Sequence, residues 1–286
     1  MANKKEVKQH IDSISDIRTI TNAMYLIAST KLRRAKENLK NARPCFNALE
    51  KTMHFLATDN YAKNTKYFRT AGEKPGIVVI TADKGLAGAY NYNVIRRTLA
   101  LLEEMPEAII FPVGTYGRQY FIKHNANVCE GFIFSSEGHT LRNARRMCEE
   151  LMQKYDDNVL NEIHVVFTDF TGGLSSAVKV KKLLPFTYEE DESAPRHDFF
   201  PSVKEVVQGI VPDYVKEYLY GAMTDSFCSE QNARMTAMDS ANRNAEKLLE
   251  ELSVKYDHIR QNTITQEIIE VSAGTARQRN KGEAGQ

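Results

Sequence analysis

The sequence predicts an α/β fold with long helices, in which N- and C-terminal helices pair as an antiparallel coiled coil. Two patterns near the chain ends indicate the coiled coil: a heptad repeat in the first sixty residues and a stripe of small residues in the last sixty. Between them, apolar runs alternate with helical patterns, which indicates an inserted Rossmann-like domain with a mainly parallel sheet. The expected parts are a first helix, an α/β domain, a second helix and a polar tail, over residues 1–57, 76–200, 203–276 and 277–286.

The first long helix should cover residues 3–57. Its apolar residues from Ala28 to Leu56 alternate steps of four and three over four heptads, and Leu32 and Leu39 are typical seam positions. Pro44 lies inside this pattern, and proline removes a backbone donor and clashes with the preceding turn. We therefore expect a bend or a helix boundary at Pro44. Residues 58–75 are polar and should form a linker.

The inserted domain begins near Gly76. Short β-branched or apolar runs alternate with helical segments, as in a parallel sheet that is covered on both faces. Strands are expected at 77–81, 108–114, 162–170 and 177–186, a short strand at 128–133, helices at 91–104, 117–124 and 137–155, and a loop at 187–201.

The second long helix should start near Val203, with Gly209 and Pro212 disturbing its first turns. Its first half carries small residues at helical spacing where a globular helix would carry leucine. Small side chains let two helix axes approach closely, so this stripe should be the coiled-coil seam. The stripe consists of Ala233, Ala237, Ala241 and Ala245. A second, apolar stripe follows it near the end of the helix and consists of Ile264, Ile268 and Val271.

The charges of the two ends also complement each other. Residues 1–43 hold ten Lys/Arg and four Asp/Glu, whereas residues 209–270 hold six Lys/Arg and eleven Asp/Glu. A basic helix beside an acidic one favours pairing, although each exposed ion pair adds little stability. The tail at 277–286 is too polar to pack and is expected to be disordered.

Composition excludes several functional classes. The net charge is +1, so no overall attraction to nucleic acid or an anionic membrane follows. Four cysteines lie far apart in the sequence, which disfavours a zinc site or a disulfide framework and fits a reducing, cytoplasmic compartment. The N-terminus is polar rather than a signal peptide, and no apolar run approaches 18 residues. We expect neither a metal nor a cofactor.

The segment most like an enzyme motif reads I-V-V-I-T-A-D-K-G-L-A-G-A-Y-N, a strand, a glycine loop and a helix. Such a turn could hold a phosphate at the helix N-terminus. It matches neither common nucleotide-binding signature, and the seven histidines are scattered. A tight turn that needs Gly85 and Gly88 is the simpler interpretation. Two alternatives stay open: a nucleotide-binding enzyme, or a coiled-coil adaptor for another partner.

Both chain ends resemble one family. The pattern S-E-x-x-A-R-M-x-A-M-x-x-A-x-x-N-A, followed by R-Q-x-x-I-T-x-E-I-x-E-V, is similar to the C-terminal signature of the gamma subunit of bacterial F-type ATP synthases. The N-terminal run I-x-S-I-x-x-I-R-T-I-T-N-A-M also resembles the opening of that family. The glycine loop is similar to the family's S-D-R-G-L-C-G-G-F-N, with small departures at Ala82, Lys84, Ala87 and Ala89.

The resemblance implies a non-catalytic, torque-transmitting subunit, present once per complex. Its two-helix rod would turn inside a hexamer of alpha and beta subunits, and its α/β domain would contact the epsilon subunit and the ring of c subunits. The rod would thereby couple transmembrane ion flow to ATP synthesis or hydrolysis. The chain would be a peripheral protein at the cytoplasmic face of the cell membrane, with no nucleic-acid partner.

The resemblance also assigns candidate contacts. Arg260 and Gln261 match the pair with which the family touches a loop of one beta subunit. A guanidinium can grip a carboxylate with two hydrogen bonds, and the adjacent amide both donates and accepts. Further candidates for contact with the beta subunits are Met24 and a basic band of Lys31, Arg33, Arg34 and Lys36. A solvated helix face is the alternative interpretation of this band.

Overall fold

A computed structural model describes residues 4–69, 72–172, 176–187 and 199–283, with side chains described up to residue 273. The chain divides into two compact units: residues 27–237, and residues 1–26 together with 238–286. Helix α1 (Lys4–Leu56) and helix α6 (Val203–Glu283) each contribute to both units.

A four-stranded sheet forms the centre of the unit of residues 27–237. The strand order is β2-β1-β3-β4, with bounds Ile109–Val113, Lys74–Ile80, Leu160–Asp169 and Ala177–Leu184. Strand β1 pairs in parallel with β2 and β3, and β4 runs antiparallel to β3. The predicted α/β fold with a mainly parallel sheet is confirmed.

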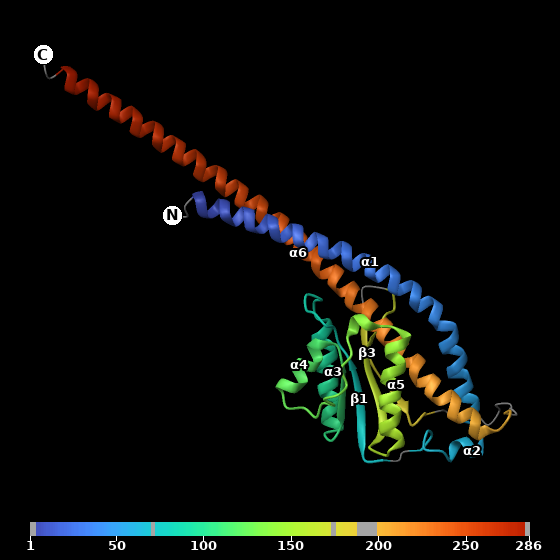
Figure 1. Ribbon diagram of the computed structural model, residues 1–286. Helices are drawn as coiled ribbons and strands as arrows, with labels where there is room; N and C mark the ends of the chain where they lie inside the picture. Colours follow the sequence, from blue (N-terminus) through green and yellow to red (C-terminus); the bar gives the residue numbers. More distant parts are fainter. Residues whose placement is uncertain (1–3, 70–71, 173–175, 188–198, 284–286) are drawn as a thin grey trace. The chain divides into compact units, whose positions relative to one another are not determined.

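Helices cover both faces of this sheet, because side chains of a strand alternate between faces. Ile77 and Val79 pack with α3 (Tyr90–Glu104) and α4 (Thr115–Lys123). Val78 and Ile80 pack on the other face with α5 (Leu141–Asp156), the end of α1 and the start of α6. Figure 1 shows α3 and α4 on one side of the strands and α5 on the other.

The described part of the expected linker at 58–75 contains a helix and packed aromatic side chains. Asp59 caps the short helix α2 (Asn60–Lys63) by accepting hydrogen bonds from the backbone amides of Tyr61 and Ala62 at 2.7 and 3.1 Å. Tyr67 and Phe68 pack against the larger core. Isolated aromatic residues in a polar stretch carry no periodicity, so the sequence pattern did not indicate this packing.

Two other boundaries differ from the expectation. In place of a strand at 128–133, isolated bridges form at Val128 and Phe134, and a 3₁₀ turn, η1 (Ser136–Gly138), precedes α5. Most of the loop expected at 187–201 lies outside the described residues.

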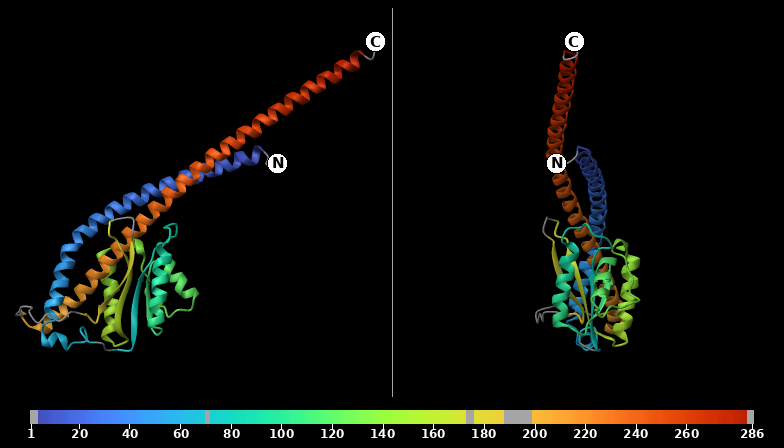
Figure 2. Two further views of the ribbon diagram at one scale, coloured as in Figure 1. Left: turned by 180° about the vertical axis from the view of Figure 1, so that it is seen from behind. Right: turned by 90° about the vertical axis from the view of Figure 1, so that its left-hand side faces the viewer.

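Neither proline ends its helix. Helix α1 continues through Pro44 and curves over its C-terminal half (Figure 2). Pro44 and Lys40 are exposed, so water can satisfy the Lys40 carbonyl that loses its donor. Helix α6 likewise runs through Pro212 without a break. Its first turn begins after Ser202, whose hydroxyl accepts from the Glu205 amide at 3.3 Å, as in a capping box.

The other unit is an antiparallel helix pair. Arg18 on α1 forms an ion pair with Glu246 on α6 at 2.9 Å, and Thr21 donates a hydrogen bond to Asn242. The ammonium of Lys4 lies 5.9 Å from the ring centroid of Tyr256. Partner numbers fall along α6 as they rise along α1, so the two helices are antiparallel.

Beyond Tyr256, α6 continues past the start of α1 as a single helix (Figure 1). It extends to Glu283, so residues 277–283 are helical and the prediction of a disordered tail is wrong for them. Residues 284–286 of that tail lie outside the described residues.

Candidate functional site

The two long helices pack through a cluster of apolar side chains in the unit of residues 27–237. Leu32 and Leu39 on α1 are buried with Phe227 and Cys228 on α6. The Phe170 ring, just after β3, joins the same cluster. The seam therefore includes a residue of the α/β domain, so it is a three-part contact rather than a two-helix one.

The alanine stripe of α6 has more than one environment. Ala233 packs against Ala82, Ala87 and Tyr90 in and after the glycine loop, a contact that the stripe alone did not predict. Ala237 and Ala241 are half-buried, and Ala245 is buried with 6% of its surface exposed. A stripe of small residues indicates close approach, but it does not say which element approaches.

The glycine loop is organised around the carboxylate of Asp83. It accepts hydrogen bonds from the hydroxyls of Ser135 (2.5 Å) and Ser136 (3.1 Å) and from the backbone amides of Thr115 (3.0 Å) and Glu137 (3.2 Å). Burial alone would raise the pKa of Asp83, but these donors outweigh burial and lower it. An ionised carboxylate at the centre of the loop disfavours a bound phosphate, which argues against the nucleotide-binding alternative.

The backbone of this loop also corrects the predicted glycine requirement. Leu86 and Gly88 have positive φ values of 61° and 54°. Gly85 does not, and a Cβ there would meet nothing within 4 Å. The stricter requirements for glycine fall outside the loop. Gly114 has a φ of 90° and an added Cβ there would clash with the Thr81 carbonyl oxygen, and at Gly117 a Cβ would lie 2.6 Å from Thr81 Oγ1.

A buried ion pair ties α6 to the same loop. The Arg234 guanidinium lies 2.6 Å from Glu230 Oε1 and donates to the Gly85 carbonyl at 3.1 Å. The Glu230 side chain is 3% exposed, and burial raises its pKa although Arg234 opposes the rise. Both residues belong to the C-terminal signature, and their contact with the α/β domain is not evident from the sequence pattern.

The structure separates the members of the basic band. The Lys31 ammonium is held by Glu137 at 2.8 Å, and the Lys36 ammonium lies 4.9 Å from the centroid of the Phe170 ring. Arg33 and Arg34 are exposed. Two members of the band therefore contact the α/β domain, and the two arginines are the members available to another protein.

The other candidate contact residues lie on the helix pair. Arg260 and Gln261 are exposed on the part of α6 beyond Tyr256, and within the described residues the Arg260 side chain has no ion pair. Met24 on α1 is half-buried. The second stripe is exposed: Ile264, Ile268 and Val271 show 43, 61 and 68% of their surface. An exposed apolar stripe of this kind is typical of an interaction surface.

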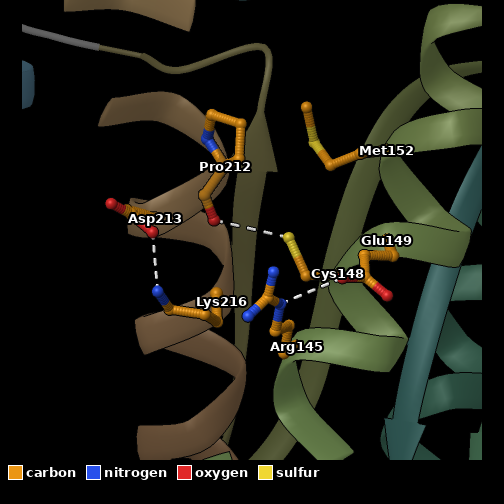
Figure 3. Close-up of a pocket in the computed structure, with 7 residues that line it drawn as sticks. All are labelled: Arg145, Cys148, Glu149, Met152, Pro212, Asp213 and Lys216. Atoms are coloured by element: carbon orange, nitrogen blue, oxygen red, sulfur yellow. Dashed lines mark hydrogen bonds and ion pairs between the residues drawn. The ribbon is translucent and has the colours of Figure 1, made fainter. Parts of the chain in front are cut away.

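A pocket of about 330 Å³ lies between α5 and the start of α6 (Figure 3). Its thiol, Cys148, donates to the Pro212 carbonyl at 3.3 Å, and burial raises the pKa of Cys148 to about 12. The charged residues at its rim are already paired, Arg145 with Glu149 at 3.0 Å and Lys216 with Asp213 at 2.6 Å. We interpret this pocket as a packing feature, because its thiol is protonated and its charges are neutralised.

The described residues contain no group of three or more His, Cys, Asp or Glu side chains placed to hold a metal ion. Within the same residues, no helix has the length and apolar character needed to cross a membrane.

Comparison with known proteins places the chain in a family. The family model described as ATP synthase matches residues 3–276. The ATP synthase gamma chain of Ruminiclostridium cellulolyticum is 35% identical over 288 residues, covering 96% of this chain and 98% of that protein. The chain belongs to the ATP synthase gamma chain family. A gamma chain from Clostridium novyi is 36% identical over 276 residues, covering 95% of this chain and 97% of the relative.

Chains in solved structures of mitochondrial ATP synthases share the fold. A chain of the Euglena gracilis mitochondrial ATP synthase matches with a TM-score of 0.69 at 15% identity, covering 98% of this chain and 95% of that one. A chain of the Tetrahymena thermophila mitochondrial ATP synthase central stalk and c-ring matches with a TM-score of 0.61 at 23% identity. That match covers 78% of this chain and 99% of the other. The pair of long helices with an α/β domain is thus a fold that this chain shares with chains of these complexes.

Proposed function

We propose that this gamma chain is the non-catalytic rotor shaft of an ATP synthase. The observation that carries the proposal is the exposed end of α6, where Ile264, Ile268 and Val271 are left in water by the chain itself. A surrounding ring of alpha and beta subunits would cover them. Arg260, Gln261, Arg33 and Arg34 are exposed and would supply polar contacts to that ring.

The mechanism follows from asymmetry. One rod inside three copies of a beta subunit cannot touch all three in the same way. Each beta subunit is then biased toward a conformation by the contacts that it makes, since a partner shifts an equilibrium only through differential contacts. Rotation would carry each catalytic site through binding, reaction and release, while the shaft performs no bond chemistry.

The α/β domain would connect the rod to the membrane part of the motor. The structures that share this fold come from complexes described as containing a c-ring and a central stalk, which supports the same partners here. We infer that the domain contacts the epsilon subunit and the c-ring, and that the chain lies at the cytoplasmic face of the membrane as a peripheral subunit.

The test is reconstitution of the chain with alpha and beta subunits of its own complex. Addition of ATP should drive rotation, in one direction, of a bead attached to the α/β domain. Failure to assemble, or hydrolysis without rotation, would overturn the proposal. Equilibrium dialysis of the chain alone with ATP tests the alternative of a nucleotide-binding enzyme. A shaft should bind no nucleotide, whereas such an enzyme should bind ATP.

A further inference from the structure

The end of β3 is attached to α6 by consecutive polar contacts, all within residues 27–237. The Thr168 amide donates to Ser226 Oγ at 3.2 Å, and the Ser229 hydroxyl donates to the Thr168 carbonyl at 3.3 Å. The Phe170 amide donates to the carboxyl group of Asp225. We name these five residues the strand–helix joint, since they hold the sheet to the long helix.

Asp225 is the ionisable member of this joint, and its carboxyl group is incompletely paired. Within the described residues its Oδ1 atom is buried and has no hydrogen-bond partner. The nearby Lys179 ammonium is paired with the Asp169 carboxylate at 2.5 Å, so it does not form an ion pair with Asp225. A buried carboxyl oxygen without a donor is costly when it carries charge and much less costly when protonated.

A cavity of about 330 Å³ adjoins Asp225, between α1, α6 and the β3–β4 hairpin, and gives it a route to solvent. Burial and the nearby Asp169 raise the pKa of Asp225 to about 7, against the opposing effects of Arg43, the Phe170 amide and Lys179. The charged or titratable groups around Asp225 are Lys36 and Arg43 from α1, Asp169 from β3, Lys179 from β4, and Glu217, Tyr218 and Cys228 from α6.

We propose that Asp225 makes the strand–helix joint proton-sensitive, tight while its carboxyl is protonated and loosened when it ionises beside Asp169. The change falls at the attachment of the α/β domain to α6. This proposal does not depend on the rotor function, because it concerns contacts within one unit of one chain.

The direction of the effect follows from linkage. A raised carboxyl pKa means that the closed joint holds a proton that the open joint, with the ordinary pKa of 3.8, has released. Closure is therefore most favoured in acid and weakens as the pH rises toward about 7. Between pH 6 and pH 8 the ratio of open to closed joint should rise about tenfold.

Amide hydrogen exchange of Phe170 measures this opening directly. In the full-length chain, the protection factor of Phe170, corrected for the intrinsic pH dependence of exchange, should fall about tenfold from pH 6 to pH 8. Asp225→Asn keeps an oxygen that can accept from the Phe170 amide but cannot ionise, so its protection should not change with pH. Asp157→Asn, at the exposed end of α5, should behave like the unmodified chain.

Two results would overturn the proposal: a flat protection factor in the unmodified chain, or the same pH dependence in Asp225→Asn. Carbon-13 NMR of the aspartate carboxyl groups in the unmodified chain gives a second measurement if Asp225→Asn fails to fold. An Asp225 inflection near pH 7 would support the proposal, and an inflection below about pH 5 would contradict it.

Discussion

The Lys31 ammonium lies 2.8 Å from the Glu137 carboxylate, so an ion pair connects α1 to the turn before α5. Both side chains are more than one-third exposed, at 40 and 46%, so the pair should contribute no more than about 1 kcal/mol. We predict that Lys31→Ala lowers the free energy of unfolding by less than about 1 kcal/mol, measured by urea denaturation.

The pH dependence of that effect has a definite sign. The hydrogen bond from Lys31 lowers the pKa of Glu137, so the pair stabilises the fold above the ordinary pKa of a glutamate. The difference between Lys31→Ala and the unmodified chain should vanish as the pH falls through the lowered pKa of Glu137. A difference that persists in strong acid would mean that Lys31 acts through packing of its aliphatic stem.

Removal of Arg234 should be far more damaging. Its pair with Glu230 is 14 and 3% exposed, and loss of one partner leaves a buried charge without compensation. We predict that Arg234→Ala lowers the free energy of unfolding by about 3–5 kcal/mol, and that acid partly restores stability because Glu230 can then be neutral.

Arg243→Ala is the matched control for Arg234→Ala. Arg243 pairs with Asp239 at the same helical spacing and at 2.9 Å, but the two side chains are 75 and 47% exposed. Its loss should cost no more than about 0.5 kcal/mol. Equal effects of the two substitutions would show that burial does not determine how much these ion pairs contribute to the free energy of unfolding.

Overpacking should distinguish positions of the alanine stripe. Ala245 is buried in the helix pair, whereas Ala241 is half-buried. Ala245→Leu should cost about 1–3 kcal/mol and Ala241→Leu less, measured by thermal denaturation of the helical circular dichroism signal. Ala23→Leu, at an exposed position of α1, should have almost no effect. The reverse order of the two stripe variants would place the seam on another face of α6.

Arg260→Ala should weaken coupling without affecting the fold. Arg260 is exposed, so its guanidinium is accessible to a carboxylate of a beta subunit. Loss of such a contact should cost about 1.5–3 kcal/mol of interaction with the beta subunit, which would lower ATP turnover and ion pumping in the reconstituted complex. Arg260→Lys should restore only part of both rates, because an ammonium cannot form the two-pronged contact. Lys247→Ala serves as the control on an exposed turn of the same helix, and unchanged rates in Arg260→Ala would remove Arg260 from the mechanism.

The four cysteines should react at very different rates. Cys45 is exposed, whereas burial raises the pKa of Cys148 and of Cys228 to about 12. Because the thiolate is the reactive form, iodoacetamide at pH 8 should modify Cys45 first and leave Cys148 and Cys228 unmodified in the folded chain. Mass spectrometry of the digested protein measures this order. We also expect no response of the complex to dithiol reduction, and a reversible several-fold change in ATP turnover would contradict that expectation.

The sequence predicted those elements whose pattern repeats. The continuous β-branched run from Ile77 to Ile80 identified a strand that is covered on both faces, and the four-three spacing placed Leu32 and Leu39 among buried residues. The sequence was not sufficient where the role of a residue depends on which element packs against it. The spacing of Ala233 says that something approaches closely, and only the fold shows that the glycine loop does so. Tyr67 and Phe68 pack without any periodic signal, and Pro44 is tolerated because it faces water.

The exposed end of α6 limits how the chain can exist outside its complex. A helix that presents Ile264, Ile268 and Val271 to water is prone to associate with other copies and with unrelated proteins. A cell that makes this chain in excess of its partners therefore produces a substrate for chaperones and proteases. The exposed apolar surface of one helix therefore requires that the subunits be synthesised in balanced amounts.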